Sequence, residues 1–227
     1  MEINYTFNDT IKIELDDVTL LGDLAVVENA KGLVVFSHGS GSSRLSNRNR
    51  FVAEHLQRSR FSTLLFDLLT EEEDQEQANR FDIPKLTQRL INTTYWIQKD
   101  ERIKDLNIGF FGASTGAASA LGAAAALGPI LQAVVSRGGR PDLAAEVLAD
   151  VLAPVLLIVG GKDEQVLDYN MQAQEQLQGI KDLQLVPDAT HLFDEPGALE
   201  MAAQLATDWF RKYLQPSKQH PLRQDKP

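Results

Sequence analysis

One serine lies at a point where a strand would run directly into a helix. Residues 112–116 read Gly-Ala-Ser-Thr-Gly, after the strand-like run 107–111 and before an alanine-rich stretch at 117–127. A G-x-S-x-G turn in this context holds its serine in a strained conformation that raises the hydroxyl clear of the backbone. The helix N-terminus behind the turn favours a developing oxyanion. The pattern therefore predicts that Ser114 is a nucleophile; the competing interpretation is a glycine-rich turn with an incidental serine.

A serine nucleophile needs a histidine as general base and a carboxylate that orients this histidine. His191 lies in a loop between the last predicted strand and the last predicted helix. Asp163 follows a buried apolar run, at the strand end where α/β sheets place their sites. The alternative role for Asp163 is a helix N-cap, and Glu164 and Asp168 are weaker candidates for the acid. We assign the other three histidines to the shape of a loop, a helix surface and the polar C-terminal segment: His38, His55 and His220.

The order of the predicted elements indicates an α/β fold. Residues 1–30 look like antiparallel strands, and short apolar runs typical of strands covered on both faces then alternate with helical patterns. This alternation implies a mostly parallel central sheet with helices on both faces and an antiparallel N-terminal edge. The expected strands are 11–15, 18–27, 32–37, 62–66, 107–111, 133–135, 155–159 and 183–186, and the expected helices are 47–58, 83–98, 115–127, 166–177 and 198–213.

Two segments between these elements carry their own expectations. The charge run at 71–76 is expected to be a solvated loop, since charged runs of this kind usually face water. The short region between 135 and 155 has room for one short helix at 143–147. We therefore expect no large lid domain and an open, shallow site.

With these features the chain resembles the α/β-hydrolase superfamily, in its dienelactone hydrolase-like branch. The resemblance covers nearly the whole chain in element order, and residues 36–44, Phe-Ser-His-Gly-Ser-Gly-Ser-Ser-Arg, look like the family's oxyanion loop. It implies the serine–acid–histidine order, here Ser114, Asp163 and His191, with the backbone N–H groups of Thr115 and Ser40 as oxyanion donors. The family also includes hydrolase domains found beside phosphoribosyltransferase domains.

The chain departs from the family in the type of its predicted nucleophile. The best-known dienelactone hydrolases use a cysteine nucleophile, and this chain has no cysteine. A serine esterase or lactonase that forms an acyl-enzyme on small carboxylic esters is therefore the function we predict, with no cofactor. The main alternative is a non-catalytic binding or scaffold domain that retains the fold. A dinucleotide-binding oxidoreductase is disfavoured, because no G-x-G-x-x-G follows the first parallel strand.

Two arginines follow the strand next to the nucleophile strand. Arg137 and Arg140 would lie near the mouth of the site, where a guanidinium can hold a substrate carboxylate or phosphate through two parallel hydrogen bonds. We predict both as substrate-binding residues for an anionic ester or lactone. The alternative for each is an ion pair with an acid such as Asp142. Arg44 and Arg48, after the oxyanion loop, are weaker candidates for the same role.

Composition limits the class of protein further. Among 227 residues, 22 are basic and 32 acidic, so the formal net charge is −10, which argues against a nucleic-acid partner. The absence of cysteine excludes a disulfide scaffold and a thiolate metal site. The first residues do not resemble a signal peptide, and the longest apolar stretch is too short to span a bilayer. We expect a cytoplasmic protein with no membrane partner, one α/β-hydrolase domain over 1–214 and a polar tail over 215–227; the oligomeric state stays open.

Overall fold

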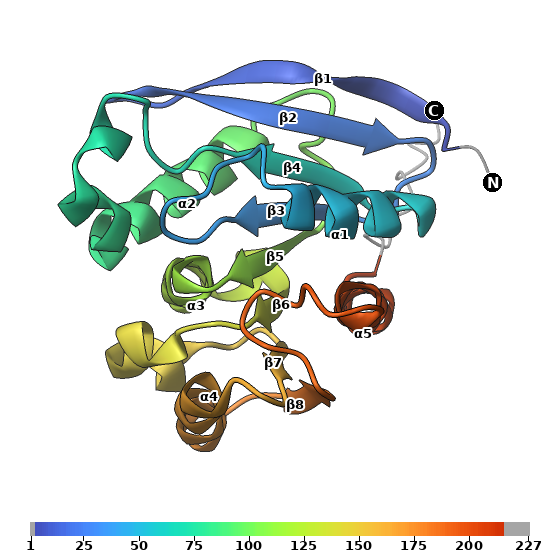
Figure 1. Cartoon of the computed structure of the whole chain (residues 1–227). Helices are drawn as coiled ribbons and strands as arrows, with labels where there is room; N and C mark the ends of the chain where they lie inside the picture. The colour runs from blue at the N-terminus through green and yellow to red at the C-terminus, as the bar shows by residue number, and fades with distance from the viewer. Residues whose placement is uncertain (1–2, 216–227) are drawn as a thin grey trace, which may run out of the picture.

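A mixed sheet runs through the centre of the molecule (Figure 1). In residues 3–215, which the computed structural model describes, eight strands form one sheet in the order β1-β2-β4-β3-β5-β6-β7-β8. The first two strands are antiparallel to each other, and β2 is antiparallel to β4; all other neighbours are parallel. The strands are β1 (Tyr5–Glu14), β2 (Thr19–Val27), β3 (Leu33–Ser37), β4 (Ser62–Phe66), β5 (Ile108–Ala113), β6 (Leu131–Arg137), β7 (Val155–Gly160) and β8 (Lys181–Val186).

Helices cover both faces of this sheet, as the alternating pattern predicts. Figure 1 shows α1 and α5 on one face and α2, α3 and α4 on the other. The helices are α1 (Asn47–Arg58), α2 (Ile83–Ile97), α3 (Thr115–Leu127), α4 (Glu164–Gln176) and α5 (Ala198–Tyr213), with short 3-10 segments η1 (Glu73–Gln75), η2 (Gln77–Phe81), η3 (Gly128–Ile130) and η4 (Pro141–Asp150). Between β6 and β7 the chain contains only η4 and short loops, so no lid domain is inserted in this described stretch.

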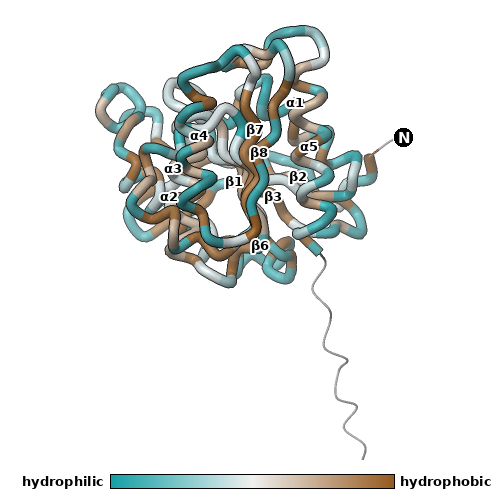
Figure 2. Tube along the Cα trace, turned by 90° about the horizontal axis from the view of Figure 1, so that it is seen from below, coloured by the Kyte–Doolittle hydropathy of each residue, from teal (hydrophilic) through white to brown (hydrophobic). Residues whose placement is uncertain are grey.

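The central strands are buried along their whole length. Every residue of β3, β4, β5 and β7 is buried, which is why these strands appear in the sequence as continuous apolar runs. Figure 2 shows these hydrophobic strands between two layers of helices. Two apolar clusters result, one against α2, α3 and η4 and the other against α1 and α5.

The N-terminal strand is longer than its sequence pattern predicts. The alternation at 11–15 reflects Ile11 and Ile13, which face the core, whereas most side chains between Tyr5 and Thr10 are exposed. Backbone pairing nevertheless continues from Glu14 opposite Thr19 to Tyr5 opposite Val27. The strand extends because hydrogen bonds of the ladder need no apolar side chain.

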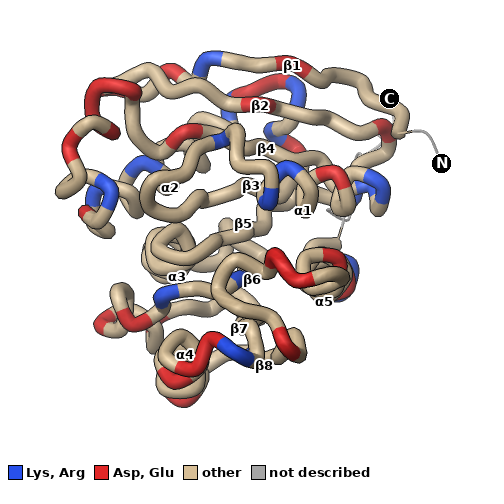
Figure 3. Tube along the Cα trace, in the orientation of Figure 1, with Lys and Arg blue, Asp and Glu red and all other residues tan. Residues whose placement is uncertain are grey.

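The acidic segment after β4 is only in part the solvated loop that its sequence predicts. Most of its residues are exposed, but Glu73 turns inward, where it binds Lys85 and the buried Arg89 at 2.9 Å each. Figure 3 shows charged positions spread over the outer helices and loops, whereas the central strands β3 and β5 carry none.

Apart from Gln215, the predicted polar tail lies outside the described residues. No helix in the described part of the chain is long and apolar enough to cross a membrane.

Candidate active site

The turn between β5 and α3 has the strained geometry that its sequence predicts. Ser114 has φ 52° and ψ −123°, in the left-handed half of conformational space that non-glycine residues rarely adopt. A Cβ atom on Gly116 would lie 2.2 Å from the Ser37 carbonyl oxygen, and one on Gly112 would lie 2.5 Å from the Cα of Ala117. Only glycine fits at these two positions, and the turn presents Ser114 at the carboxyl end of the sheet.

Three side chains from three separate loops meet at this turn. The Ser114 Oγ lies 3.2 Å from Nε2 of His191, and Nδ1 of His191 lies 2.7 Å from Oδ2 of Asp163. Because a carboxylate only accepts hydrogen bonds, Nδ1 carries the proton and Nε2 faces the serine with its lone pair. Asp163 occupies the N-cap position of α4, but its side chain makes no capping hydrogen bond. The carboxylate is therefore bound to the imidazole and not to the helix.

The two predicted oxyanion donors lie beside each other. Thr115 is the first residue of α3, so its N–H has no acceptor within the helix. The Ser40 N–H, however, donates to Oγ1 of Thr115 at 2.7 Å. No sequence pattern indicates this contact, and an oxyanion that used the Ser40 N–H would have to take the place of the threonine hydroxyl.

His38 holds the loop that carries Ser40. Its Nε2 accepts from the Leu68 N–H at 3.0 Å, so its Nδ1 carries a proton and donates to the Gly39 carbonyl, also at 3.0 Å. Burial lowers the pKa of His38, more than the Gly39 carbonyl and Asp67 raise it. The neutral ring thus fixes the Gly39–Ser40 peptide, which is the loop-shaping role that the sequence predicts for His38.

A small cavity opens in front of the serine. Its volume is about 210 Å³, below the range of about 300–1,000 Å³ that is usual for ligand pockets. Polar and basic side chains from the oxyanion loop, α1 and the end of β6 form much of its wall. The lining residues are Gly39, Ser40, Ser42, Ser46, Arg48, Asn49, Ala113, Ser114, Arg137, His191 and Leu192.

Arg137 lies in this wall as a buried cation with no counter-ion. Its residue is 6% exposed, and among residues 3–215 no carboxylate lies within ion-pair distance of its guanidinium, whose Nε makes no hydrogen bond. The guanidinium lies over the ring of Phe193, 5.3 Å from its centre. Burial, and then the charge of Arg48, lower the pKa of Arg137 to about 10, while Asp194 opposes this shift. The side chain is therefore still protonated at neutral pH.

Arg140 requires a correction. It does not line the cavity; its Nε and Nη2 bind both carboxylate oxygens of Asp142 at 2.8 and 2.7 Å. Its guanidinium also lies 4.8 Å from the centre of the Tyr169 ring. The ion-pair alternative describes Arg140, and we withdraw its assignment to substrate binding.

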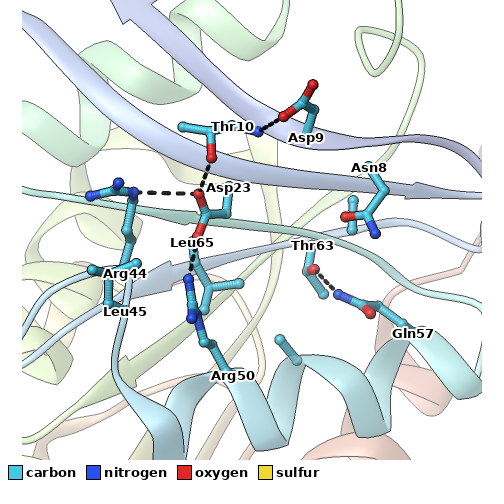
Figure 4. A pocket seen from close by; sticks show the side chains of 12 residues that line it. Asn8, Asp9, Thr10, Asp23, Arg44, Leu45, Arg50, Gln57, Thr63 and Leu65 are labelled. Carbon is cyan, nitrogen blue, oxygen red and sulfur yellow. Dashed lines mark hydrogen bonds and ion pairs between the residues drawn. The ribbon is translucent and has the colours of Figure 1, made fainter.

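Arg44 is also neutralised, in a second and separate hollow. This groove of about 380 Å³ lies between α1 and the strands β1, β2 and β4 (Figure 4). Within it Asp23 binds Arg44 at 3.3 Å and Arg50 at 2.9 Å, and Arg44 also binds Asp67 at 2.6 Å. The arginines of this groove have carboxylate partners, in contrast to Arg137.

Several residues of the cavity wall have weak or no sequence signals. Arg48 is a minor candidate from the sequence, whereas Asn49 carries no signal at all, although it is buried and its Oδ1 lacks a hydrogen-bond partner.

His191 beside acidic Asp194 and Glu195 also fits a metal cluster by composition. No group of three or more potential metal ligands occurs in the described residues, and His191 is already bound to Ser114 and Asp163.

The strained serine turn on a mostly parallel sheet with helices on both faces defines an α/β-hydrolase. The profile of the dienelactone hydrolase family matches residues 20–216, and the chain belongs to this family. A dienelactone hydrolase from Anabaena variabilis, whose crystal structure is known, is 50% identical in sequence to this chain. It superposes with a TM-score of 0.90 and covers 92% of this chain and 99% of its own. Family and fold together assign the chain to the hydrolases.

Other similar structures support the fold alone. Est1E from Butyrivibrio proteoclasticus matches 90% of this chain and 98% of its own at a TM-score of 0.77, with 17% identity. An esterase from Pyrococcus furiosus matches 92% of each chain at a TM-score of 0.71, also with 17% identity.

Curated relatives are longer proteins. Proteins of two Mycobacterium tuberculosis strains, both named "Putative phosphoribosyl transferase", are 53% identical over 207 residues. The match takes in 91% of this chain but 47% of each relative. The chain thus spans about half the length of the curated relatives it matches.

Proposed function

We propose that this chain is a serine hydrolase that cleaves small carboxylic esters or lactones through an acyl-enzyme. The observation that carries the proposal is the continuous hydrogen-bonded line from Ser114 through His191 to Asp163. A serine hydroxyl is a weak nucleophile, and a neutral imidazole aligned with it is the usual means of activation. The strained Ser114 backbone and the cavity in front of it support the same assignment.

Acylation follows from this geometry. Nε2 of His191 takes the Ser114 proton while Oγ attacks the substrate carbonyl, and Asp163 stabilises the imidazolium that forms. The tetrahedral oxyanion accepts hydrogen bonds from the N–H groups of Thr115 and Ser40, the latter released from the Thr115 hydroxyl. His191 then gives its proton to the departing alkoxide as the carbon–oxygen bond breaks, which leaves an ester on Ser114.

Deacylation reverses these roles. A water molecule gives a proton to His191 and attacks the acyl carbonyl, and the imidazolium returns the proton to Ser114 as the acid product leaves. The small volume of the cavity favours short acyl groups or small rings.

The buried arginine supports a substrate that carries an acidic group. An uncompensated charge inside a protein costs several kcal/mol, roughly, so its retention points to a ligand that completes the pair. Arg137 lies in the wall of the cavity that contains Ser114 and holds its proton at neutral pH. Under this proposal, Arg137 binds a carboxylate or phosphate of the ester or lactone.

The test uses Ser114→Ala against a panel of p-nitrophenyl esters and small lactones. We expect hydrolysis by the wild type and a loss of turnover of about 10⁴-fold or more in the variant. A fluorophosphonate probe should label the wild type at Ser114, because only an activated serine reacts. Unchanged ester turnover in Ser114→Ala contradicts the assignment of the nucleophile. No turnover and no labelling of the wild type favours the alternative, a binding or scaffold domain that retains the fold.

A further inference from the structure

An ion pair crosses the rim of the candidate active site. Nη1 of Arg48, in the first turn of α1, lies 3.2 Å from Oδ1 of Asp194, which is three residues beyond His191. Arg48 lines the same cavity as Ser114 and Arg137. The pair therefore joins the helix after the oxyanion loop to the segment that carries the proposed base.

The backbone conformation of Phe193 directs its own side chain toward Arg137 and that of Asp194 toward Arg48. Phe193 adopts a φ of 58°, which is rare for a residue with an aromatic side chain. It is buried, and its ring lies under the guanidinium of Arg137, whereas Asp194 is exposed beside Arg48. The strained backbone at Phe193 thus places an aromatic face against Arg137 and the carboxylate of the next residue, Asp194, beside Arg48.

The three charged groups act on one another. Besides burial, the charges that influence the pKa of Arg137 are those of Arg48, which lowers it, and Asp194, which raises it. These three side chains, two guanidinium groups and one carboxylate, together carry a surplus positive charge, and the N-terminus of the 12-residue helix α1 adds to it.

We propose that Asp194 is a resident counter-ion that sets the preference of the site for anionic substrates. In the free enzyme Asp194 binds Arg48; when an anionic substrate enters, its oxyanion group displaces Asp194 and is held by Arg48 and Arg137 together. The Arg48–Asp194 pair is 37% and 61% exposed, and exposed ion pairs of this kind contribute little, so the exchange is easy. The inference rests on the proposed function and deepens it, because it names the residue that competes with the anionic group of the substrate for Arg48.

The decisive variant is Asp194→Asn, which removes the competing charge with little change in shape. Its substrates are mono-p-nitrophenyl succinate, which is anionic, and p-nitrophenyl butyrate, which is neutral and of similar size. We expect the ratio of kcat/KM for the anionic ester to that for the neutral ester to rise by about fivefold, mainly through KM. Glu54→Gln is the matched control, because Glu54 also pairs with an arginine of α1, Arg58, but does not line the cavity. This control should leave the ratio unchanged.

Arg48→Gln tests whether the effect passes through Arg48. This substitution should lower the same ratio, and in its background Asp194→Asn should have a smaller effect than in the wild type, because only the action of Asp194 on Arg137 then remains. Inhibition of p-nitrophenyl butyrate hydrolysis by succinate and by inorganic phosphate distinguishes the two anion types: the one that binds more tightly to Asp194→Asn than to the wild type is the chemistry the site accepts.

Two outcomes overturn the inference: an unchanged ratio in Asp194→Asn, which includes equal changes for both esters, or an Asp194→Asn effect of undiminished size in the Arg48→Gln background. Neither affects the proposed nucleophile, which Ser114→Ala tests with the neutral ester alone. The inference about Asp194 and the proposed function can therefore fail separately.

Discussion

At the scale of single residues, the charge state and partners of each side chain decide its role. Asp163 is the N-cap residue of α4, so its position in the sequence fits both a helix cap and the acid that orients His191. Its carboxylate binds His191 and makes no capping hydrogen bond, so its contacts fit only the second role. Arg137 and Arg140, in contrast, have similar positions in the sequence but different partners in the structure. They lie three positions apart with the same side chain, but only Arg140 has a carboxylate partner among the described residues.

The first prediction concerns the cost of the buried cation. Arg137→Met should remove the preference for anionic over neutral esters, raising KM for mono-p-nitrophenyl succinate by about tenfold or more, because a hydrogen-bonded charge pair is lost. The free energy of unfolding should not fall and should rise by about 1 kcal/mol, since the folded protein no longer buries an unpaired charge. Urea denaturation and steady-state kinetics measure the two effects. A large loss of stability would show that Arg137 is a structural residue.

The same cation gives a second prediction, in its dependence on pH. The pKa of Arg137 is lowered to about 10, so the side chain loses its charge as the pH rises through that value. Inhibition of p-nitrophenyl butyrate hydrolysis by succinate should therefore weaken between pH 9 and 11, about one pH unit to either side of this pKa. The contribution of this group to the free energy of unfolding rises over the same interval, because the unfolded chain then binds more protons. In Arg137→Met, the pH dependence of inhibition should disappear; its persistence would assign it to another group.

At the scale of the secondary-structure elements, close backbone contact between β3 and α3 determines the geometry of the serine turn. Gly116 is in the first turn of α3, where the carbonyl oxygens of Ser37 and His38 lie 2.2 and 2.5 Å from the place of a Cβ atom. Strand end, oxyanion loop and helix start are therefore packed backbone to backbone. A side chain at this point would separate the elements that carry Ser114 and Ser40.

Gly116→Ala should accordingly lower both kcat and the free energy of unfolding. A backbone shift of about 1 Å in a catalytic site costs about 100-fold in rate, and overpacking costs about 1–3 kcal/mol of stability. Ester kinetics and urea denaturation of the same preparation give both values. The control is Gly122→Ala in the same helix, where the new methyl would meet only the side chain of Thr87. Equal activity in the two variants would show that the contact with β3 does not position the site.

At the scale of the whole molecule, the two apolar layers hold together the strands and helices that carry the site. Phe210 of α5 is fully buried, 6.1 Å from the Phe61 ring by ring centres, and a Cβ atom on Gly109 of β5 would lie 2.8 Å from its ring. Helix α5 is thus packed directly on the strand that leads to Ser114, close to the start of that strand and away from the serine turn at its other end.

Phe210→Ala should therefore destabilise the fold while it leaves the chemistry of the folded molecules intact. Truncation of a buried phenylalanine costs about 3–5 kcal/mol. We expect the urea midpoint to fall accordingly, while kcat per molecule that reacts with a fluorophosphonate probe stays near the wild-type value at 25 °C. If kcat per active site fell sharply as well, α5 would have a role in positioning the serine turn beyond its packing.

Features of this protein that depend on local patterns can be predicted from the amino-acid sequence. Continuous apolar runs predicted the buried strands because residues covered on both faces must all be apolar. The glycine spacing around Ser114 predicted the strained turn because the clashes that require glycine occur between near neighbours and adjacent strands. The resemblance to the α/β-hydrolases implies the chain order of Ser114, Asp163 and His191, and in the structure these three side chains meet.

The partner of each polar group, in contrast, depends on how distant segments of the chain pack together. Arg48 and Asp194 are 146 residues apart, and no local pattern connects them. Glu73 lies in an acidic run that resembles a solvated loop, yet the fold brings it to Arg89 and Lys85. The Ser40 N–H binds the hydroxyl of Thr115, and Arg140 is paired where Arg137 is not. These differences arise because hydrogen bonds and ion pairs depend on distances of a few ångströms between segments that are remote in the chain, and sequence spacing does not encode such distances.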